Sequence, residues 1–260
     1  MSSLYYYRRL INLYYFYFYN FIITAISYKY CIVSTSYYLL LEIFMRGITA
    51  ISNSVCVGLS TGGINIFKFS QYEQLSSGHT SMQTLNPTFQ NPITALSSSR
   101  SMMCAGNENG DVSVYEMDNK NDFTVLCTFH GKSSPLTCLC CQKDNNTIYA
   151  GFLSGHIRIY RPNIAEMTIE ITAHVRSITG IILDPLNKFY ATCGEDQFFQ
   201  VWNIPDFSNE NYVLDLKNDV LFFSELIENR LCTGLAFLPD NKIAVASYDD
   251  ESLVVFQQQI

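Results

Sequence analysis

Charged side chains are scarce in this chain of 260 residues, and basic side chains are the scarcest. Only 15% of the residues are charged, and 16 lysines and arginines are outnumbered by 23 aspartates and glutamates, for a formal net charge of -7. A protein that holds nucleic acid by its phosphates needs a basic surface. The sequence also has no long run of one sign, which argues against a polybasic membrane patch. We therefore expect no nucleic-acid partner.

The sequence also lacks the residue spacings by which metal sites and catalytic centres are recognised. Its four histidines are scattered, and its nine cysteines stand at irregular intervals with no second Cys/His pair at zinc-ligand spacing. It has no nucleophile elbow and no phosphate-binding glycine loop. We therefore predict no metal site, no cofactor and no catalytic residue.

The cysteines favour a reducing environment. Their number is odd, and most of them lie in apolar, strand-like runs, where a free thiol packs as a small hydrophobic group. In the tightest cluster, strand alternation places Cys138 and Cys140 on one face and Cys141 on the other. We expect an intracellular, cytoplasmic protein.

Residues 1–45 differ in composition from the rest of the chain. Fifteen of them are Tyr or Phe, and an uncharged stretch at residues 10–28 follows two arginines. That stretch is just long enough to cross a bilayer as a helix. Asn12 and Asn20 interrupt it, and tyrosine prefers the membrane interface to the hydrocarbon centre. Three interpretations stay open: a membrane anchor, divergent strands of the following domain, or sequence that is not a genuine part of the protein.

Residues 46–260 contain one unit five times. Each copy has a short apolar strand, a second strand that ends in a small residue, and a third strand that ends in an aromatic residue. The small residues, 43 to 53 positions apart, are Gly58, Gly106, Gly151, Gly194 and Ser247. The aromatic residues are Phe67, Tyr115, Tyr160, Trp202 and Phe256. The units cover approximately residues 46–70, 92–118, 135–162, 173–205 and 231–258.

A tight turn joins the second and third strands of each unit. Gly62, Gly110 and Gly155 stand in three of these turns, where a two-residue hairpin requires positive φ. Each unit is therefore predicted to be a small antiparallel sheet. One such sheet cannot bury both of its faces, so we expect neighbouring units to stack as the blades of a propeller do.

The repeated unit resembles the WD40 repeat, and the fourth copy, AHVRSITGIILDPLNKFYATCGEDQFFQVWN (173–203), resembles it most. More closely, RGITAISNSVCVGLSTGGINIF (46–67), the fourth copy and SYDD (247–250) are similar to the family of WD repeat-containing protein 54. The resemblance covers about four-fifths of the chain and is absent from residues 1–45. It implies an all-β, WD40-type β-propeller with five recognisable blades.

The resemblance assigns a structural role to four polar residues. The structural tetrad of the WD40 repeat falls on His174, Thr192, Asp196 and Trp202. In such repeats the four groups form a buried hydrogen-bonded network that holds a turn against the strands. The other copies lack the tryptophan and the histidine, and His130 stands out of register before a glycine. We therefore expect those four blades to rely on aromatic packing alone.

Five blades are fewer than the seven with which WD40 propellers usually close. A ring left open would expose long sheet edges, which are an aggregation hazard. An incomplete seven-bladed ring, truncated at its N-terminal side, or a different closure would explain the number.

The resemblance implies a non-enzymatic scaffold or adaptor whose partners are other proteins or peptides. The insertions at residues 70–91 and 206–230 are the expected contact regions, and the second carries the apolar residues Leu221, Phe222 and Phe223. The simpler interpretation of the second insertion is an outer fourth strand and a linker. One alternative is a membrane-tethered propeller with residues 10–28 as its anchor. The other is an enzyme, which needs carboxylates or histidines of several blades at the central channel.

Overall fold

We describe the protein from a computed structural model. The described residues are 47–68, 81–86, 88–142, 147–205, 221–240, 242–248 and 250–257. They cover most of each of the five predicted units but none of residues 1–45, so the three interpretations of that segment, and the anchor at residues 10–28, lie outside the described residues.

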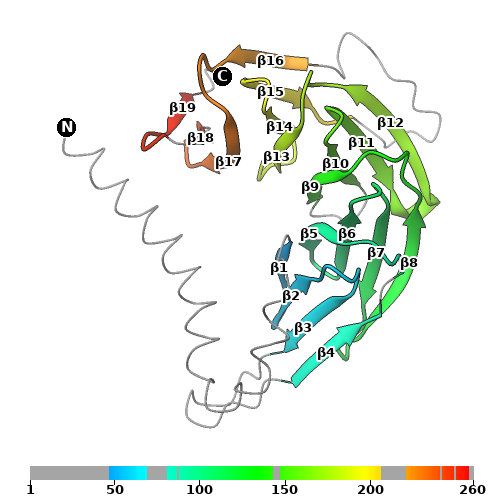
Figure 1. Cartoon of the computed structure of the whole chain (residues 1–260). Helices are drawn as coiled ribbons and strands as arrows, with labels where there is room; N and C mark the ends of the chain where they lie inside the picture. The colour runs from blue at the N-terminus through cyan, green and yellow to red at the C-terminus, as the bar shows by residue number, and fades with distance from the viewer. Residues whose placement is uncertain are drawn as a thin grey trace. The chain divides into compact units, whose positions relative to one another are not determined.

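The described residues form five antiparallel sheets, in which consecutive strands are neighbours (Figure 1). Sheet 1 holds β1 (Ile48–Ile51), β2 (Ser54–Gly58), β3 (Ile64–Lys68) and β4 (Ser81–Leu85). Sheet 2 holds β5 (Ile93–Ser99), β6 (Met102–Asn107), β7 (Val112–Met117) and β8 (Phe123–Phe129). Sheet 3 holds β9 (Leu136–Cys141), β10 (Ile148–Phe152), β11 (His156–Arg161) and, after the short 3₁₀ helix η1 (Pro162–Ile164), β12 (Glu166–Thr172).

The last two sheets differ in strand number. Sheet 4 holds β13 (Ile178–Leu183), β14 (Phe189–Gly194), β15 (Phe198–Asn203) and β16 (Leu221–Leu226). Sheet 5 holds β17 (Cys232–Leu238), β18 (Lys242–Ser247) and β19 (Val254–Gln257). The sequence predicted three strands in each unit and offered an outer fourth strand only within residues 206–230, whereas sheets 1 to 4 each have an outer strand. Periodicity missed β4, β8 and β12 because an outer strand is solvated and carries a weaker apolar pattern.

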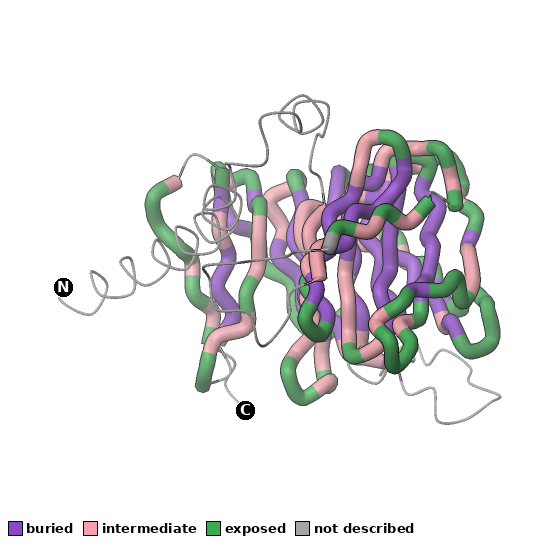
Figure 2. The backbone as a smooth tube through the Cα atoms, turned by 90° about the horizontal axis from the view of Figure 1, so that it is seen from below, coloured by how far each residue is buried: buried purple, intermediate pink, exposed green. Residues whose placement is uncertain are grey.

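The sheets stack in chain order, with the first strand of each sheet against the first strand of the next (Figure 1). Each interface between neighbouring sheets has its own hydrophobic core, so four cores separate the five described sheets. Figure 2 shows burial along the strands and exposure at the turns that join them. A sheet with cores on both faces needs apolar residues at successive positions, which explains why the middle strands β6 and β10 are buried throughout.

The small residue that ends each second strand makes room for the next sheet. A Cβ atom added at this position in sheets 1 to 3 would collide with the residue near the start of the following first strand. The three close approaches are Gly58 with Ile93, Gly106 with Leu136, and Gly151 with Ile178. The turn glycines predicted to have positive φ are confirmed, with φ of 88° at Gly62, 82° at Gly110 and 80° at Gly155.

The predicted orientation of the cysteine cluster is also confirmed. Cys141 belongs to the core between sheets 2 and 3, whereas Cys138 and Cys140 pack against the core between sheets 3 and 4. Alternation along β9 thus sends neighbouring thiols into two different cores.

Candidate functional site

The turns between second and third strands lie beside the loops that lead into the first strands, at one end of the sheets. Backbone hydrogen bonds join them: Leu153 N donates to Pro135 O, Glu195 N to Ser177 O, and Tyr248 N to Leu231 O, at 2.9, 2.9 and 2.7 Å. We call this surface the loop face. It consists of turns 108–111, 153–155 and 195–197, Tyr248, and loops 130–135, 173–177 and 227–231.

The four residues assigned to the structural tetrad meet beneath the loop face in sheet 4. His174 lies in the loop before β13, Thr192 on β14, Asp196 in the β14–β15 turn and Trp202 on β15. His174 Nδ1 lies 2.9 Å from Asp196 Oδ1, His174 Nε2 lies 2.9 Å from Thr192 Oγ1, and Trp202 Nε1 lies 2.9 Å from the same Thr192 oxygen. The chain of contacts therefore connects a loop, a turn and two strands.

The chemistry of these groups fixes the direction of each hydrogen bond. The Trp202 N–H can only donate, so Thr192 Oγ1 accepts from it. The Asp196 carboxylate can only accept, so His174 carries a proton on Nδ1 and donates it to Asp196. In the neutral ring Nε2 then has no proton and accepts the Thr192 hydroxyl hydrogen. Burial of the ring lowers the pKa of His174, against the opposing effect of the Asp196 carboxylate. The imidazole is therefore neutral, and its donors and acceptors are all satisfied.

Asp196 also fixes the backbone of the loop face. Its Oδ2 accepts from Val175 N at 2.9 Å, and its Oδ1 accepts from Phe198 N at 3.2 Å. The carboxylate thus holds the loop before β13 and the start of β15 at once. The order of contacts from Thr192 through His174 to Asp196 is also that of a hydrolytic triad, but Thr192 is fully buried, so its hydroxyl is not accessible to a substrate and the network positions backbone.

Sheet 2 contains a second polar network that the sequence analysis missed. Asn107 Oδ1 accepts from the backbone N–H of Asn109 and of Asp111, and Asn107 Nδ2 donates to Asp111 Oδ2 at 2.9 Å. Asp111 Oδ1 accepts from Gly131 N at 2.7 Å. The expectation that all blades other than the fourth rely on aromatic packing alone was wrong for sheet 2. The Asn-x-x-x-Asp spacing in NENGD was the available signal, because asparagine and aspartate cap their own turns.

His130, which the sequence placed out of register, has no part in this network. Its ring packs edge-on against Phe89 at a centroid distance of 5.4 Å. The neighbouring Gly131 supplies the backbone N–H instead. The sequence analysis considered only side chains in this loop and therefore missed the contact of Gly131.

A threonine in the first strand of each unit was a further missed feature. Sheets 2 to 5 have a register shift at this position between the first and second strands. Thr137 Oγ1 donates to Ile178 O at 2.5 Å, and Thr179 Oγ1 donates to Cys232 O at 2.6 Å. Each hydroxyl therefore joins one sheet to the next. The signal was a threonine at the same place in every repeat, in ITA, ITA, LTC, ITG and CTG.

Four exposed large apolar side chains lie on the loop face: Leu231 and three that are more exposed. Val175 is 88% exposed, Tyr248 is 70% exposed and Leu153 is 50% exposed. They come from the loop before sheet 4 and from the turns of sheets 5 and 3. Exposed apolar groups on anchored loops are a usual feature of protein-binding surfaces.

The predicted contact regions fall mostly outside the loop face, as far as they are described; only residues 227–230 of the second region belong to it. Within residues 70–91 the structure describes β4 and a few residues after it, and within residues 206–230 it describes β16 and the loop that follows. Both strands are the outermost of their sheets, which agrees with the simpler interpretation of the second insertion. Leu221, Phe222 and Phe223 are exposed on β16, where their role in docking stays a prediction.

Two searches of the described residues concern other kinds of site. No three His, Cys, Asp or Glu side chains in the described part of the chain come together so that they could hold a metal ion. No helix within the described ranges is long and apolar enough to cross a membrane.

Comparison with known proteins extends the sequence resemblance. Residues 8–258 match the WDR54 family model. The chain is 26% identical to WD repeat-containing protein 54 of Mus musculus over 230 residues, which cover 82% of this chain and 63% of the mouse protein. It is 24% identical to the Homo sapiens protein of the same name over 223 residues, which cover 80% of this chain and 61% of the human protein. The chain thus spans about three-fifths of the length of these curated relatives. The expectation that the resemblance is absent from residues 1–45 was wrong, because the family match begins at residue 8.

Solved structures show the same fold. A chain in the crystal structure of the mitotic checkpoint complex superposes with a TM-score of 0.65 at 16% identity, covering 82% of this chain and 60% of that one. Sqt1 from Chaetomium thermophilum superposes with a TM-score of 0.66 at 14% identity, covering 82% of this chain and 56% of the Sqt1 chain. The predicted all-β, WD40-type β-propeller is therefore confirmed.

Proposed function

The chain belongs to the WDR54 family, and from that premise we propose that it is a non-enzymatic scaffold that binds other proteins or peptides on its loop face. WD40 propellers generally serve as protein-interaction scaffolds. A chain of the mitotic checkpoint complex is among its structural neighbours, which supports protein partners as a class.

The observation that carries the proposal is the exposure of Val175 on a fixed backbone. Its side chain is 88% exposed, while its own N–H is bonded to the buried carboxylate of Asp196. A group displayed in this way loses little conformational entropy when a partner covers it. Tyr248 on sheet 5 and Leu153 on sheet 3 are exposed apolar side chains of the loop face on the neighbouring sheets.

We also propose a cytoplasmic location. The eight cysteines within the described residues all carry free thiols. Disulfides persist in oxidising compartments and are rare in the cytosol, so unpaired thiols in this number support a reducing environment.

Affinity purification with quantitative mass spectrometry tests the loop face as a binding surface. The double variant Val175→Asp, Tyr248→Asp adds charge at two exposed positions and is expected to lose most of the co-purifying proteins. Leu186→Asp is the matched control, because Leu186 is 68% exposed in the β13–β14 turn at the opposite end of sheet 4. An equal partner set for the double variant and the control, with unchanged melting temperatures, would refute the loop face as the site.

A further inference from the structure

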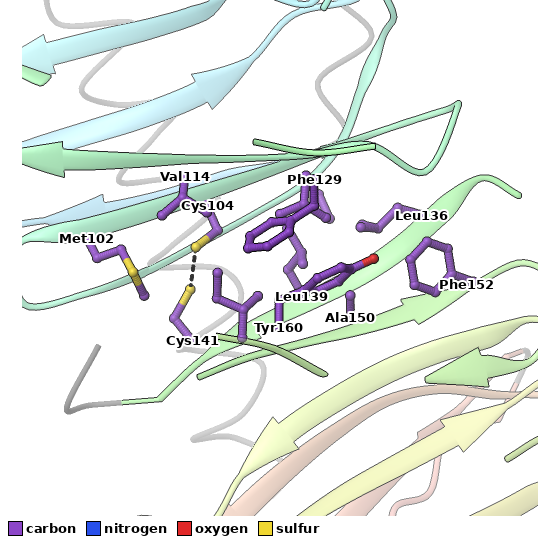
Figure 3. Close-up of a cluster of buried hydrophobic side chains, with 13 residues drawn as sticks. Met102, Cys104, Val114, Phe129, Leu136, Leu139, Cys141, Ala150, Phe152 and Tyr160 are labelled. Atoms are coloured by element: carbon purple, nitrogen blue, oxygen red, sulfur yellow. Dashed lines mark hydrogen bonds between the residues drawn. The ribbon is translucent and has the colours of Figure 1, made fainter. Parts of the chain in front are cut away.

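Two thiols of adjacent sheets are in direct contact in the core between sheets 2 and 3 (Figure 3). Cys104 lies on β6 and Cys141 ends β9. The Cys141 thiol donates to Cys104 Sγ with a sulfur–sulfur distance of 3.1 Å. Among the described cysteines this is the only pair whose thiols are hydrogen-bonded to each other.

The backbone holds the two cysteines at this separation. Ser97 of β5 pairs with Cys104 in the sheet register, and its hydroxyl oxygen accepts from Cys141 N at 3.1 Å. Cys141 is in turn paired with Ile148 of β10. Both thiols therefore stand on sheet positions that are fixed independently of the contact between the sulfur atoms.

We propose that Cys104 and Cys141 form a site of reversible oxidative modification, at which a peroxide converts the two thiols into a disulfide that joins sheet 2 to sheet 3. A disulfide bond is about 2.04 Å long, so the sulfur atoms need to approach by about 1 Å. Rotation of the two side chains can supply most of that movement without displacing either strand.

The difference in exposure sets the order of the steps. Cys104 is fully buried, and Cys141 is 7% exposed. The Cys141 thiol reacts first: its sulfur attacks the peroxide O–O bond, giving a sulfenic acid and releasing water. Cys104 Sγ then attacks the sulfenic sulfur, its proton leaves with the departing hydroxyl as a second water, and the S–S bond forms.

The environment of Cys104 suits the second step better than the first. Burial is the main cause that raises the pKa of Cys104 well above its ordinary value, and the hydrogen bond with Cys141 adds to the effect. Cys104 therefore stays a thiol and is inert toward external oxidants until the sulfenic acid forms beside it. Cys56 serves as the control cysteine for the experiment below, because it is also fully buried but lies in the core between sheets 1 and 2.

Peptide mapping of the full-length chain tests the proposal. The protein is treated with hydrogen peroxide, denatured, alkylated with N-ethylmaleimide and digested with trypsin, which places Cys104 on peptide 101–120 and Cys141 on peptide 133–143. We expect one linked pair of these peptides, assigned to Cys141 by fragmentation and separated by dithiothreitol. The oxidised protein is expected to melt about 5–10 °C higher, because the link closes a long loop between two sheets.

Two variants complete the experiment. Cys104→Ala should abolish the linked pair and leave Cys141 to accumulate as sulfenic and sulfinic acid, whereas Cys56→Ala should form the link as the unaltered protein does. Separately alkylated peptides 101–120 and 133–143 after peroxide treatment would overturn the proposal. A disulfide that uses Cys127 or Cys140 in place of either partner would overturn it as well.

Discussion

Sheets 4 and 2 both use an aspartate in the turn between the second and third strands to hold a loop, but they hold different loops. Asp196 accepts from Val175 N, in the loop before the first strand of its own sheet, and Asp111 accepts from Gly131 N, in the loop that leads from β8 to sheet 3. In sheet 4 a histidine and a tryptophan extend the network down to the strands. In sheet 2 the side chains of the network are only Asp111 and Asn107, which ends β6, and no side chain of β7 joins them.

The two networks differ in how much of the stability of the fold depends on a single residue. A buried polar group stabilises a fold only while its partners are present, and its loss leaves the remaining members unsatisfied in a low-dielectric interior. Sheet 4 commits four side chains to one network, whereas sheet 2 commits two. Damage to Asp196 is therefore expected to cost more than damage to Asp111.

Asp196→Ala is expected to have the largest effect. It leaves the His174 Nδ1–H and the Val175 N–H without their acceptor, at a cost of about 2–3 kcal/mol in the free energy of unfolding. For a domain of this size the melting temperature should fall by about 5–9 °C. Glu195→Ala, at the exposed neighbouring position, is the control and should change it little. An unchanged melting temperature for Asp196→Ala would count against the network.

Asp111→Ala should have an intermediate effect, a loss of about 1–2 kcal/mol in the free energy of unfolding. It leaves the Gly131 N–H and one amide hydrogen of Asn107 without an acceptor. Chemical denaturation of Asp111→Ala, Asn107→Ala and the double variant measures the coupling between the two side chains. The double variant should cost clearly less than the two single variants together. Additive or negligible effects would mean that sheet 2 relies on aromatic packing, as the sequence predicted.

The sequence predicted the features that repeat or follow a family motif. Five copies of one pattern predicted the sheets, the turn glycines and the stacking, and the fourth copy predicted which four side chains meet at His174. The Asn107–Asp111 network was not predicted, because it occurs once and follows no WD40 motif. Among the outer strands, only β16 was expected, from the simpler interpretation of the second insertion; β8 and β12 were not predicted, because most of their positions are not buried and show no regular buried periodicity.

Contacts between loops and between sheets could not be predicted from the sequence for a different reason. Gly131 enters its network through a backbone N–H, which every residue except proline carries. The proximity of Cys104 and Cys141 likewise depends on how two sheets stack, which no local pattern specifies. Packing between sheets decided both contacts.

Trp202→Phe gives sheet 4 the residue that two other units carry at the corresponding position, and so measures what the indole N–H adds to the stability of the blade. The variant loses one hydrogen bond, from the indole N–H to Thr192 Oγ1, and is expected to cost about 1 kcal/mol. Thr192→Val removes the acceptor, so Trp202→Phe should cost less in that background than alone. Equal costs in the two backgrounds would attribute the loss to the smaller ring and not to the hydrogen bond.

The pH dependence of the stability that His174 contributes in sheet 4 should be the smallest effect and the most diagnostic. Burial lowers the pKa of His174 in the folded protein, so below pH 6.5 the unfolded chain binds a proton that the folded chain does not. The contribution of His174 to stability is therefore fully present above that pH and decreases as the pH falls below it. His174→Asn lacks the titrating group, so the difference in unfolding free energy between it and the unaltered protein should narrow from pH 7.5 to pH 5.5. In sheet 2, Asn107→Ala removes no titratable group and should give a constant difference. A gap that widens at low pH for His174→Asn would mean that the folded imidazole is charged and ion-paired with Asp196, and that the neutral hydrogen-bond chain from Trp202 is wrong.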